Sequence, residues 1–131
     1  MKYMMMMNAP AGTGEYQINK WSPDDFTAHI QFMIDFDRRL RSAGELVDAQ
    51  GLTPPTQARL VRAGPDGSPI IDGAFPDTKE FLVGFWIIDV ESPARAHALA
   101  AQVSAAPGPG GKPLNMPIEV RPVAEGPPPQ G

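Results

Sequence analysis

Residues 82–90, LVGFWIIDV, have the composition of a β-strand and are apolar on both faces. Because successive side chains of a strand point to opposite sides, these residues fall into two sets. One set is Val83, Phe85 and Ile87, and the other is Gly84, Trp86, Ile88 and Val90. Residues 3–7 repeat the pattern, with Met4 and Met6 on one side and Tyr3, Met5 and Met7 on the other. Both strands therefore need cover on two sides, which one layer of helices cannot provide.

Two Ser-Pro pairs indicate where two helices begin. Ser22 is a good N-cap and Pro23 suits the first helical position, which predicts a helix over residues 23–43 that stops at Gly44. The segment SPARAHALAAQVSAAPG, residues 92–108, repeats this beginning. The predicted buried stripes are Phe26, Ile30, Met33, Phe36 and Leu40 in the first helix, and Ala96, Leu99, Ala100 and Val103 in the second.

The remaining pattern predicts an antiparallel sheet. Further strands are expected at residues 2–7, 45–52, 56–64 and 116–123, with a short piece at 69–72 and a hairpin turn at 64–69. This order predicts the α+β class, as a ferredoxin-like βαββαβ sandwich with both helices on one face of the sheet. We expect a single domain over residues 1–123 and a flexible Pro/Gly-rich tail at 124–131.

With both helices on one face, the second apolar face of the sheet stays open. We expect a homodimer in which two sheets pack face to face, because large exposed apolar patches are rare on monomers. The alternative is that loop 8–21 folds over the open face. That loop is long for a compact domain and is therefore a candidate functional loop.

Charge and composition argue against several classes of partner. Eleven Lys and Arg against 15 Asp and Glu leave no basic cluster for nucleic acid or for a membrane surface. No transmembrane stretch occurs, and the apolar run at 3–7 is shorter than the roughly 7–15 residues of a signal-peptide core. The absence of cysteine suits the cytoplasm. With two histidines and no dinucleotide-binding glycine motif, we expect neither a metal site nor a cofactor.

His29 lies within the apolar arc of the first predicted helix, and so does Asp37. A histidine there is a candidate general acid or base, because its ordinary pKa of about 6.5 lets it exchange protons near neutrality. The alternative is a packed histidine whose ring nitrogens are satisfied by backbone or by a carboxylate. His97 lies at the edge of the second stripe, where a solvated or interfacial position is expected.

The segment DGAFPDTKE, residues 72–80, is predicted to be a turn before the long strand. In one interpretation Asp72 caps backbone N–H groups of that turn. In the other, Asp72 orients His29 or takes a substrate proton. Four further residues are candidates for ligand binding, because they supply a cation, a second carboxylate and two aromatic rings. They are Lys79, Glu80, Phe75 and Trp86.

Four segments together resemble the YCII-related, DGPF-domain family: MKYMMMM at 1–7, AGELVDAQGL at 43–52, DGAFPDTKEFLVGFWIIDVES at 72–92 and PIEVRPV at 117–123. The namesake Asp-Gly-Pro-Phe appears here with Ala74 in place of proline, which loosens the turn but keeps the carboxylate and the ring. The resemblance implies a ferredoxin-like protomer in a dimeric α+β barrel. In related YciI-type proteins, a His-Asp pair in a cleft suggests an enzyme.

Two functions from different classes fit these observations. The first is an accessory or regulatory module that binds a small molecule in a cleft next to the sheet without catalysis. The second is a small cofactorless enzyme in which His29 and Asp72 act as acid and base, in isomerisation, lactone cleavage or elimination.

Overall fold

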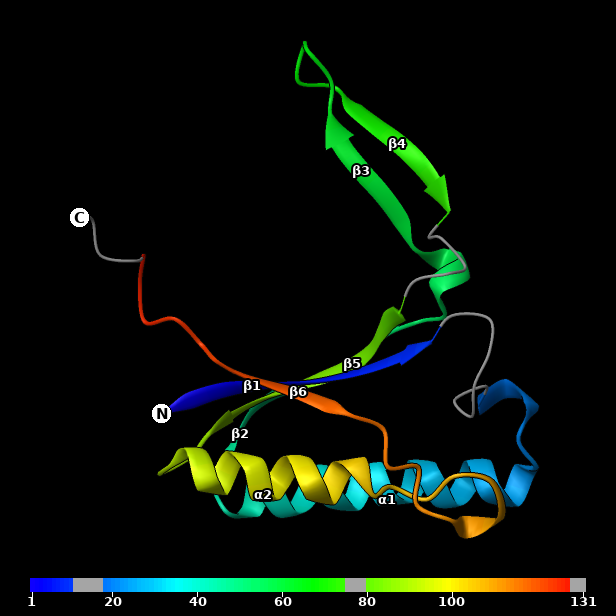
Figure 1. The fold of residues 1–131 in the computed structure, drawn as a ribbon, viewed down its shortest axis with the longest axis vertical. Helices are drawn as coiled ribbons and strands as arrows, with labels where there is room; N and C mark the ends of the chain where they lie inside the picture. Colours follow the sequence, from blue (N-terminus) through cyan, green and yellow to red (C-terminus); the bar gives the residue numbers. More distant parts are fainter. Residues whose placement is uncertain (11–17, 75–79, 128–131) are drawn as a thin grey trace.

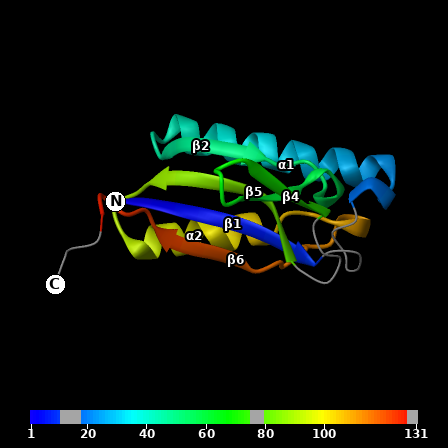
Figure 2. The same cartoon turned by 90° about the horizontal axis from the view of Figure 1, so that it is seen from above.

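The computed structural model describes residues 1–10, 18–74 and 80–127. Its main sheet has four antiparallel strands in the order β2-β5-β1-β6. They are β1 (Lys2–Pro10), β2 (Leu46–Gly51), β5 (Glu80–Asp89) and β6 (Ile118–Pro122). Helices α1 (Pro23–Ser42) and α2 (Pro93–Ser104) lie on the same face of the sheet (Figure 1). Seen from above, α1 runs next to β2 and α2 next to β6 (Figure 2). The predicted α+β class is confirmed.

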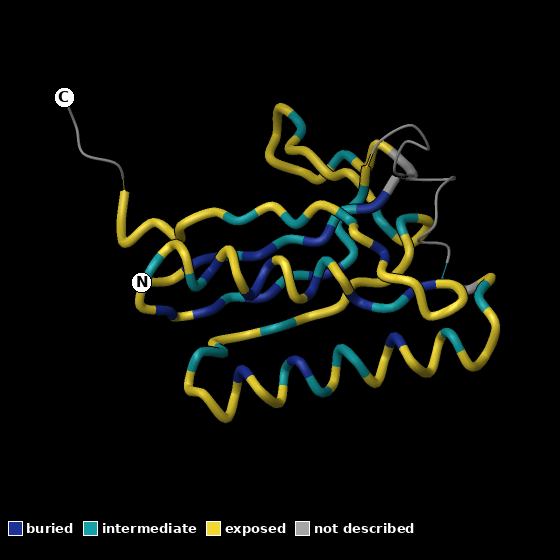
Figure 3. The backbone as a smooth tube through the Cα atoms, turned by 60° about the horizontal axis from the view of Figure 1, so that its bottom comes forward, coloured by how far each residue is buried: buried dark blue, intermediate teal, exposed yellow. Residues whose placement is uncertain are grey.

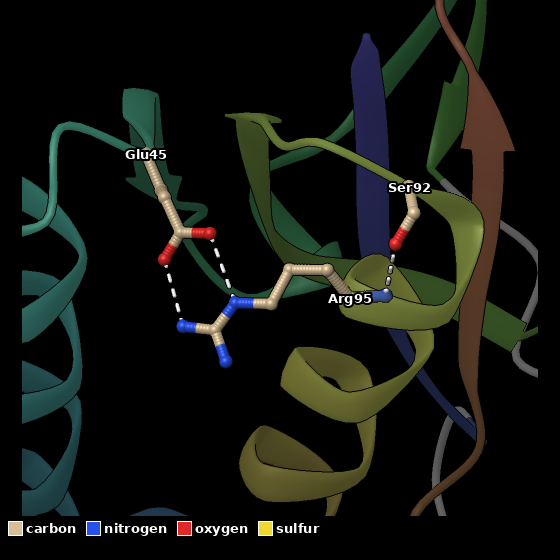
Figure 4. A network of polar contacts seen from close by, with 3 residues as sticks. All are labelled: Glu45, Ser92 and Arg95. Atoms are coloured by element: carbon tan, nitrogen blue, oxygen red, sulfur yellow. Dashed lines mark hydrogen bonds and ion pairs between the residues drawn. The ribbon is translucent and has the colours of Figure 1, made fainter.

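Both helices begin at the predicted Ser-Pro pairs. The Ser22 hydroxyl accepts a hydrogen bond from the backbone N–H of Asp25, at 3.2 Å. The Ser92 hydroxyl accepts one from the backbone N–H of Arg95 at the same distance (Figure 4). After α1 the chain turns at Gly44, whose φ of +73° favours glycine. The helix predicted over 23–43 is therefore confirmed to within one residue.

The core lies between the helices and the sheet. Met5 and Trp86 are opposite each other on β1 and β5, and both are buried. The Trp86 ring meets the Phe36 ring of α1 edge to face, with 5.9 Å between the ring centroids. The buried cluster comprises Tyr3, Met5, Met7, Phe36, Leu40, Trp86, Ile88, Val90, Ala96, Leu99, Ala100, Val103 and Leu114. The predicted division of both central strands into two faces is confirmed, as is the whole stripe predicted for α2.

The stripe predicted for α1 is wrong in its first two turns. Phe26 and Ile30 are 43% and 38% exposed, whereas His29 is only 1% exposed. The loop that follows α2 lies against this part of α1, and its Pro107 carbonyl accepts a hydrogen bond from the His29 ring. The covered side of the helix is therefore rotated toward His29, which periodicity alone does not reveal.

No helix of the described residues covers the other face of the sheet. Its central residues Met4, Met6, Phe85 and Ile87 are half-buried, and we call them the open-face strip. The loop predicted at 8–21 is wrong at its beginning, because β1 continues to Pro10. Residues 11–17 of that loop lie outside the described part of the chain.

A second, two-stranded sheet forms a hairpin that projects from the side of the main sheet opposite the helices (Figure 1). Its strands are β3 (Arg59–Ala63) and β4 (Pro69–Ala74), joined by the predicted turn. Every residue of β3 is exposed, and the hairpin is yellow over most of its length in Figure 3. The turn predicted at 72–80 is wrong in its first part, because Asp72 lies within β4. After β6, residues 124–127 are exposed, and 128–131 lie outside the described residues.

Candidate functional site

A cavity of about 330 Å³ opens between α1 and the part of the sheet formed by β2 and β5. We call it the helix–sheet pocket. Small-molecule sites in proteins have volumes of about 300–1,000 Å³ and a mostly apolar lining with a few polar groups. The lining here has that character: Met7, Ile18, His29, Ile30, Met33, Asp37, Ala49, Gln50, Gly51, Leu52, Val83, Gly84, Phe85 and Trp86.

Two glycines line this space on the side of the sheet. Gly51 of β2 and Gly84 of β5 are register partners, and they share the helix-facing side with the pair Ala49 and Trp86. A Cβ atom on Gly51 would meet no heavy atom within 4 Å. A Cβ atom on Gly84 would lie 2.9 Å from the carbonyl oxygen of Gln50, so the close approach of the two strands requires glycine there.

Helix α1 contributes the polar groups of the pocket. His29, Met33 and Asp37 follow one another at intervals of four residues, which places them along one face of the helix. All three line the pocket. A titratable ring and a carboxylate are therefore presented to one apolar cavity from the same element.

His29 is held in a defined orientation. Its Nδ1 lies 2.9 Å from the carbonyl oxygen of Pro107, and its ring meets the Trp21 ring edge to face at 5.3 Å between centroids. Because a carbonyl only accepts hydrogen bonds, Nδ1 carries a proton, and in the neutral ring the lone pair is on Nε2. Burial lowers the pKa of His29, and this outweighs the opposite effect of the Pro107 bond. The ring is therefore neutral at pH 7.

Asp37 is oriented by a residue of the sheet. The indole Nε1–H of Trp86 donates a hydrogen bond of 2.8 Å to Asp37 Oδ1. Within residues 1–10, 18–74 and 80–127, no Lys, Arg or His side chain forms an ion pair with this carboxylate. A carboxylate accepts about four hydrogen bonds, so one indole leaves most of that capacity unused.

The structure brings two of the predicted site residues together and separates a third. His29 and Trp86 both line the helix–sheet pocket. Asp72 lies on the projecting hairpin, on the other side of the sheet, where its Oδ2 is 3.2 Å from Nε of Arg62. One chain by itself therefore does not bring Asp72 to His29, and the Asp72 carboxylate binds a side chain instead of capping a turn.

The remaining predicted residues lie apart from this pocket or outside the described chain. Glu80 is exposed at the beginning of β5, where it lines a separate depression with Asn8 and Glu119. Phe75 and Lys79 fall in the segment 75–79, outside the described residues.

Sequence reasoning did not select Asp37, Gly51 or Gly84 as site residues. The spacing of eight between His29 and Asp37 was a usable signal for the first, because it places both on one helical face. The glycine pair had no such signal, since its meaning depends on the register between two strands that are far apart in sequence.

A metal site and a membrane-spanning helix each have requirements that can be compared with the described residues. No group of three or more His, Asp or Glu side chains there is arranged to hold a metal ion. None of the described helices has the length and apolar character needed to cross a bilayer.

Comparison with known proteins gives two matches. The family model for the YCII-related domain matches residues 1–108, which include every residue that lines the pocket. An uncharacterised protein of Rhizobium meliloti (strain 1021) is 32% identical over 104 residues, which cover 79% of this chain and 80% of the relative.

Proposed function

The chain belongs to the YCII-related domain family, and on that premise we propose that it is a homodimeric accessory or regulatory module that binds a small molecule. The ligand would occupy the helix–sheet pocket. The observation that carries the proposal is the cavity of about 330 Å³ beneath α1, which Gly84 lines and which is open in front of Gly51. Its mostly apolar lining with a few polar groups is typical of small-molecule sites.

The proposed dimer is a dimeric α+β barrel, in which two ferredoxin-like protomers pack sheet against sheet. The open-face strip supports this proposal, because Met4, Met6, Phe85 and Ile87 form an apolar surface on the face that none of the described helices covers. Burial of such a surface is the dominant favourable term in association. The absence of cysteine supports a cytoplasmic location.

Filling the pocket tests the proposal. Gly51→Val introduces a side chain that suits a strand, and its Cβ would enter open space. The wild-type protein is first screened against a library of metabolites by thermal shift, because a ligand of the native state raises the apparent stability. We expect the shift to disappear in Gly51→Val.

The matched control is Gly126→Val, since a Cβ there also meets nothing within 4 Å and Gly126 does not line the pocket. This variant should keep the full thermal shift. A ligand that stabilises Gly51→Val as strongly as wild type binds elsewhere, and the proposal is then wrong.

A second candidate function, acid–base catalysis without a cofactor, is favoured by the state of His29. Its ring is neutral at pH 7, with the proton on Nδ1 and the lone pair on Nε2, as a general base requires. Asp37 is the carboxylate that shares its pocket, whereas Asp72 is the one that the sequence predicted as its partner. Turnover of a ligand found in the screen should be lost in His29→Ala. Unchanged turnover in both His29→Ala and Asp72→Asn would exclude this second function.

A further inference from the structure

The helix–sheet pocket contains a negative charge that the described chain does not neutralise. Asp37 lines the cavity, and its hydrogen bond comes from the uncharged indole of Trp86. Other carboxylates of the same chain are paired with arginine, as Glu45 is with Arg95 and Asp72 with Arg62. The Asp37 carboxylate differs from these two, because no ion pair within residues 1–10, 18–74 and 80–127 includes it.

This charge determines which ligands the pocket favours. Charges attract more strongly in a largely apolar cavity than in water, because the local dielectric constant is lower. Among the lining residues that the structure describes, the other titratable side chain is His29, which is neutral at pH 7 because burial lowers its pKa. It therefore supplies no positive charge to a ligand. A carboxylate or phosphate ligand would be repelled by Asp37 and would lose its hydration without gaining a counter-ion.

The rest of the lining suits an apolar body. Met7 and Met33 provide flexible thioether side chains that adapt to irregular shapes, and Trp86 provides an aromatic wall. The space in front of Gly51 is open, so a ring or branched chain can extend toward β2. The pocket therefore suits a ligand with a positively charged end and an apolar end.

We propose that the ligand of the helix–sheet pocket is a small amphipathic amine, whose protonated nitrogen pairs with Asp37 and whose apolar body fills the space beside Gly51 and Gly84. This inference rests on the proposed ligand-binding function and adds the chemical class of the ligand. It assigns to Asp37 the selection of a cation and to Trp86 the orientation of that carboxylate.

Three probes with a common phenyl body test the inference. They are 2-phenylethylamine, which is a cation at pH 7, 2-phenylethanol, which is neutral, and 3-phenylpropionate, which is an anion. Binding to the full chain is measured by isothermal titration calorimetry at pH 7 and low salt. We expect the amine to bind roughly tenfold or more tightly than the alcohol, as a charge-assisted hydrogen bond predicts, and the anion to bind most weakly.

Two variants separate the local charge from the net charge of the protein. Asp37→Asn keeps an oxygen that can accept the Trp86 hydrogen bond but removes the charge, so the amine should fall to the affinity of the alcohol. Asp35→Asn makes the same change in net charge at a side chain that is 50% exposed and does not line the pocket. It should leave the affinity for the amine unchanged.

The outcomes distinguish this inference from the function on which it rests. Equal affinities for the amine and the alcohol, both lost in Gly51→Val, would overturn the amine inference and leave the binding pocket standing. Tightest binding of the anion, or no binding of the amine at millimolar concentration, would also overturn it. The metabolite screen decides independently whether the pocket binds a ligand of another class.

Discussion

Arg95, in the first turn of α2, holds the Glu45 carboxylate by two parallel hydrogen bonds: Nε to Oε2 at 2.9 Å and Nη2 to Oε1 at 2.8 Å (Figure 4). Glu45 directly precedes β2, the strand that contributes Gly51 to the pocket. The side chain of Glu45 is only 15% exposed. This ion pair therefore connects the beginning of α2 to the edge strand of the site.

Arg95→Lys should destabilise the protein although the charge is kept. Lysine cannot form the two-pronged contact with a carboxylate, so we expect the free energy of unfolding to fall by about 1 kcal/mol. Urea denaturation measures this change. Arg62→Lys is the control, because the Arg62–Asp72 pair on the hairpin is 62% and 42% exposed and should contribute less than about 0.5 kcal/mol. Equal losses in the two variants would argue against the structural role of Arg95.

The same ion pair predicts a pH dependence of stability. The Arg95 hydrogen bonds hold the pKa of Glu45 below its ordinary value. The folded state then binds fewer protons than the unfolded state, so the pair stabilises above pH about 4.3 and its contribution is lost as the pH falls through the lowered pKa. Glu45→Gln should therefore be less stable than wild type at pH 7, and the difference should shrink as the pH falls below about 4.3. A stability difference that is constant with pH, measured by urea denaturation, contradicts this prediction.

His29 should titrate below the ordinary histidine range. Burial lowers its pKa, so the unfolded state binds more protons below pH about 6.5. The free energy of unfolding is therefore highest above that pH and decreases as the pH falls toward the pKa of His29 in the folded state. The chain has two histidines, so two-dimensional NMR of the imidazole protons gives two titration curves, and His97→Asn assigns them. A His29 midpoint at or above 6.5 would contradict the buried, hydrogen-bonded ring.

The two opposed glycines should respond differently to the same substitution. Gly84→Ala places Cβ 2.9 Å from the backbone oxygen of Gln50, which has to move, so we expect a loss of about 1–3 kcal/mol in unfolding free energy. Gly51→Ala meets nothing within 4 Å and should change stability by less than about 0.5 kcal/mol. Thermal and urea denaturation measure both variants. Similar values for the two would mean that the strands are not as close at Gly84 as the structure has them.

The proposed dimer predicts that a charge on the open-face strip separates the protomers. Ile87→Glu places a carboxylate in the middle of the apolar strip, where burial without a partner is costly, and should yield a monomer by sedimentation velocity. Ile34→Glu is the matched control, because Ile34 is 47% exposed and belongs to α1, which lies on the opposite face of the sheet. Wild-type protein that sediments as a monomer at micromolar concentration would refute the dimer.

Local chemistry explains why much of the fold was predictable. The helix beginnings at Ser22 and Ser92 depend on a side chain and a backbone N–H three residues away. The two faces of β1 and β5 follow from an alternation with a period of two, which each strand carries in its own residues. By contrast, the exposure of Phe26 and Ile30 depends on where the distant loop after α2 lies, and no periodicity within α1 contains that information.

The candidate site, too, was predictable in part from the sequence and in part only from the tertiary structure. The sequence by itself determined that His29 and Asp37 share one face of a helix and that Trp86 lies on the same face of its strand as Ile88, because each of these facts follows from the geometry of a single element. Only the tertiary structure decided that Gly51 lies opposite Gly84 and that β4, which contains Asp72, lies on the other side of the sheet from α1, which contains His29. Both depend on strand order and register between distant segments, which are set by the packing of the whole chain.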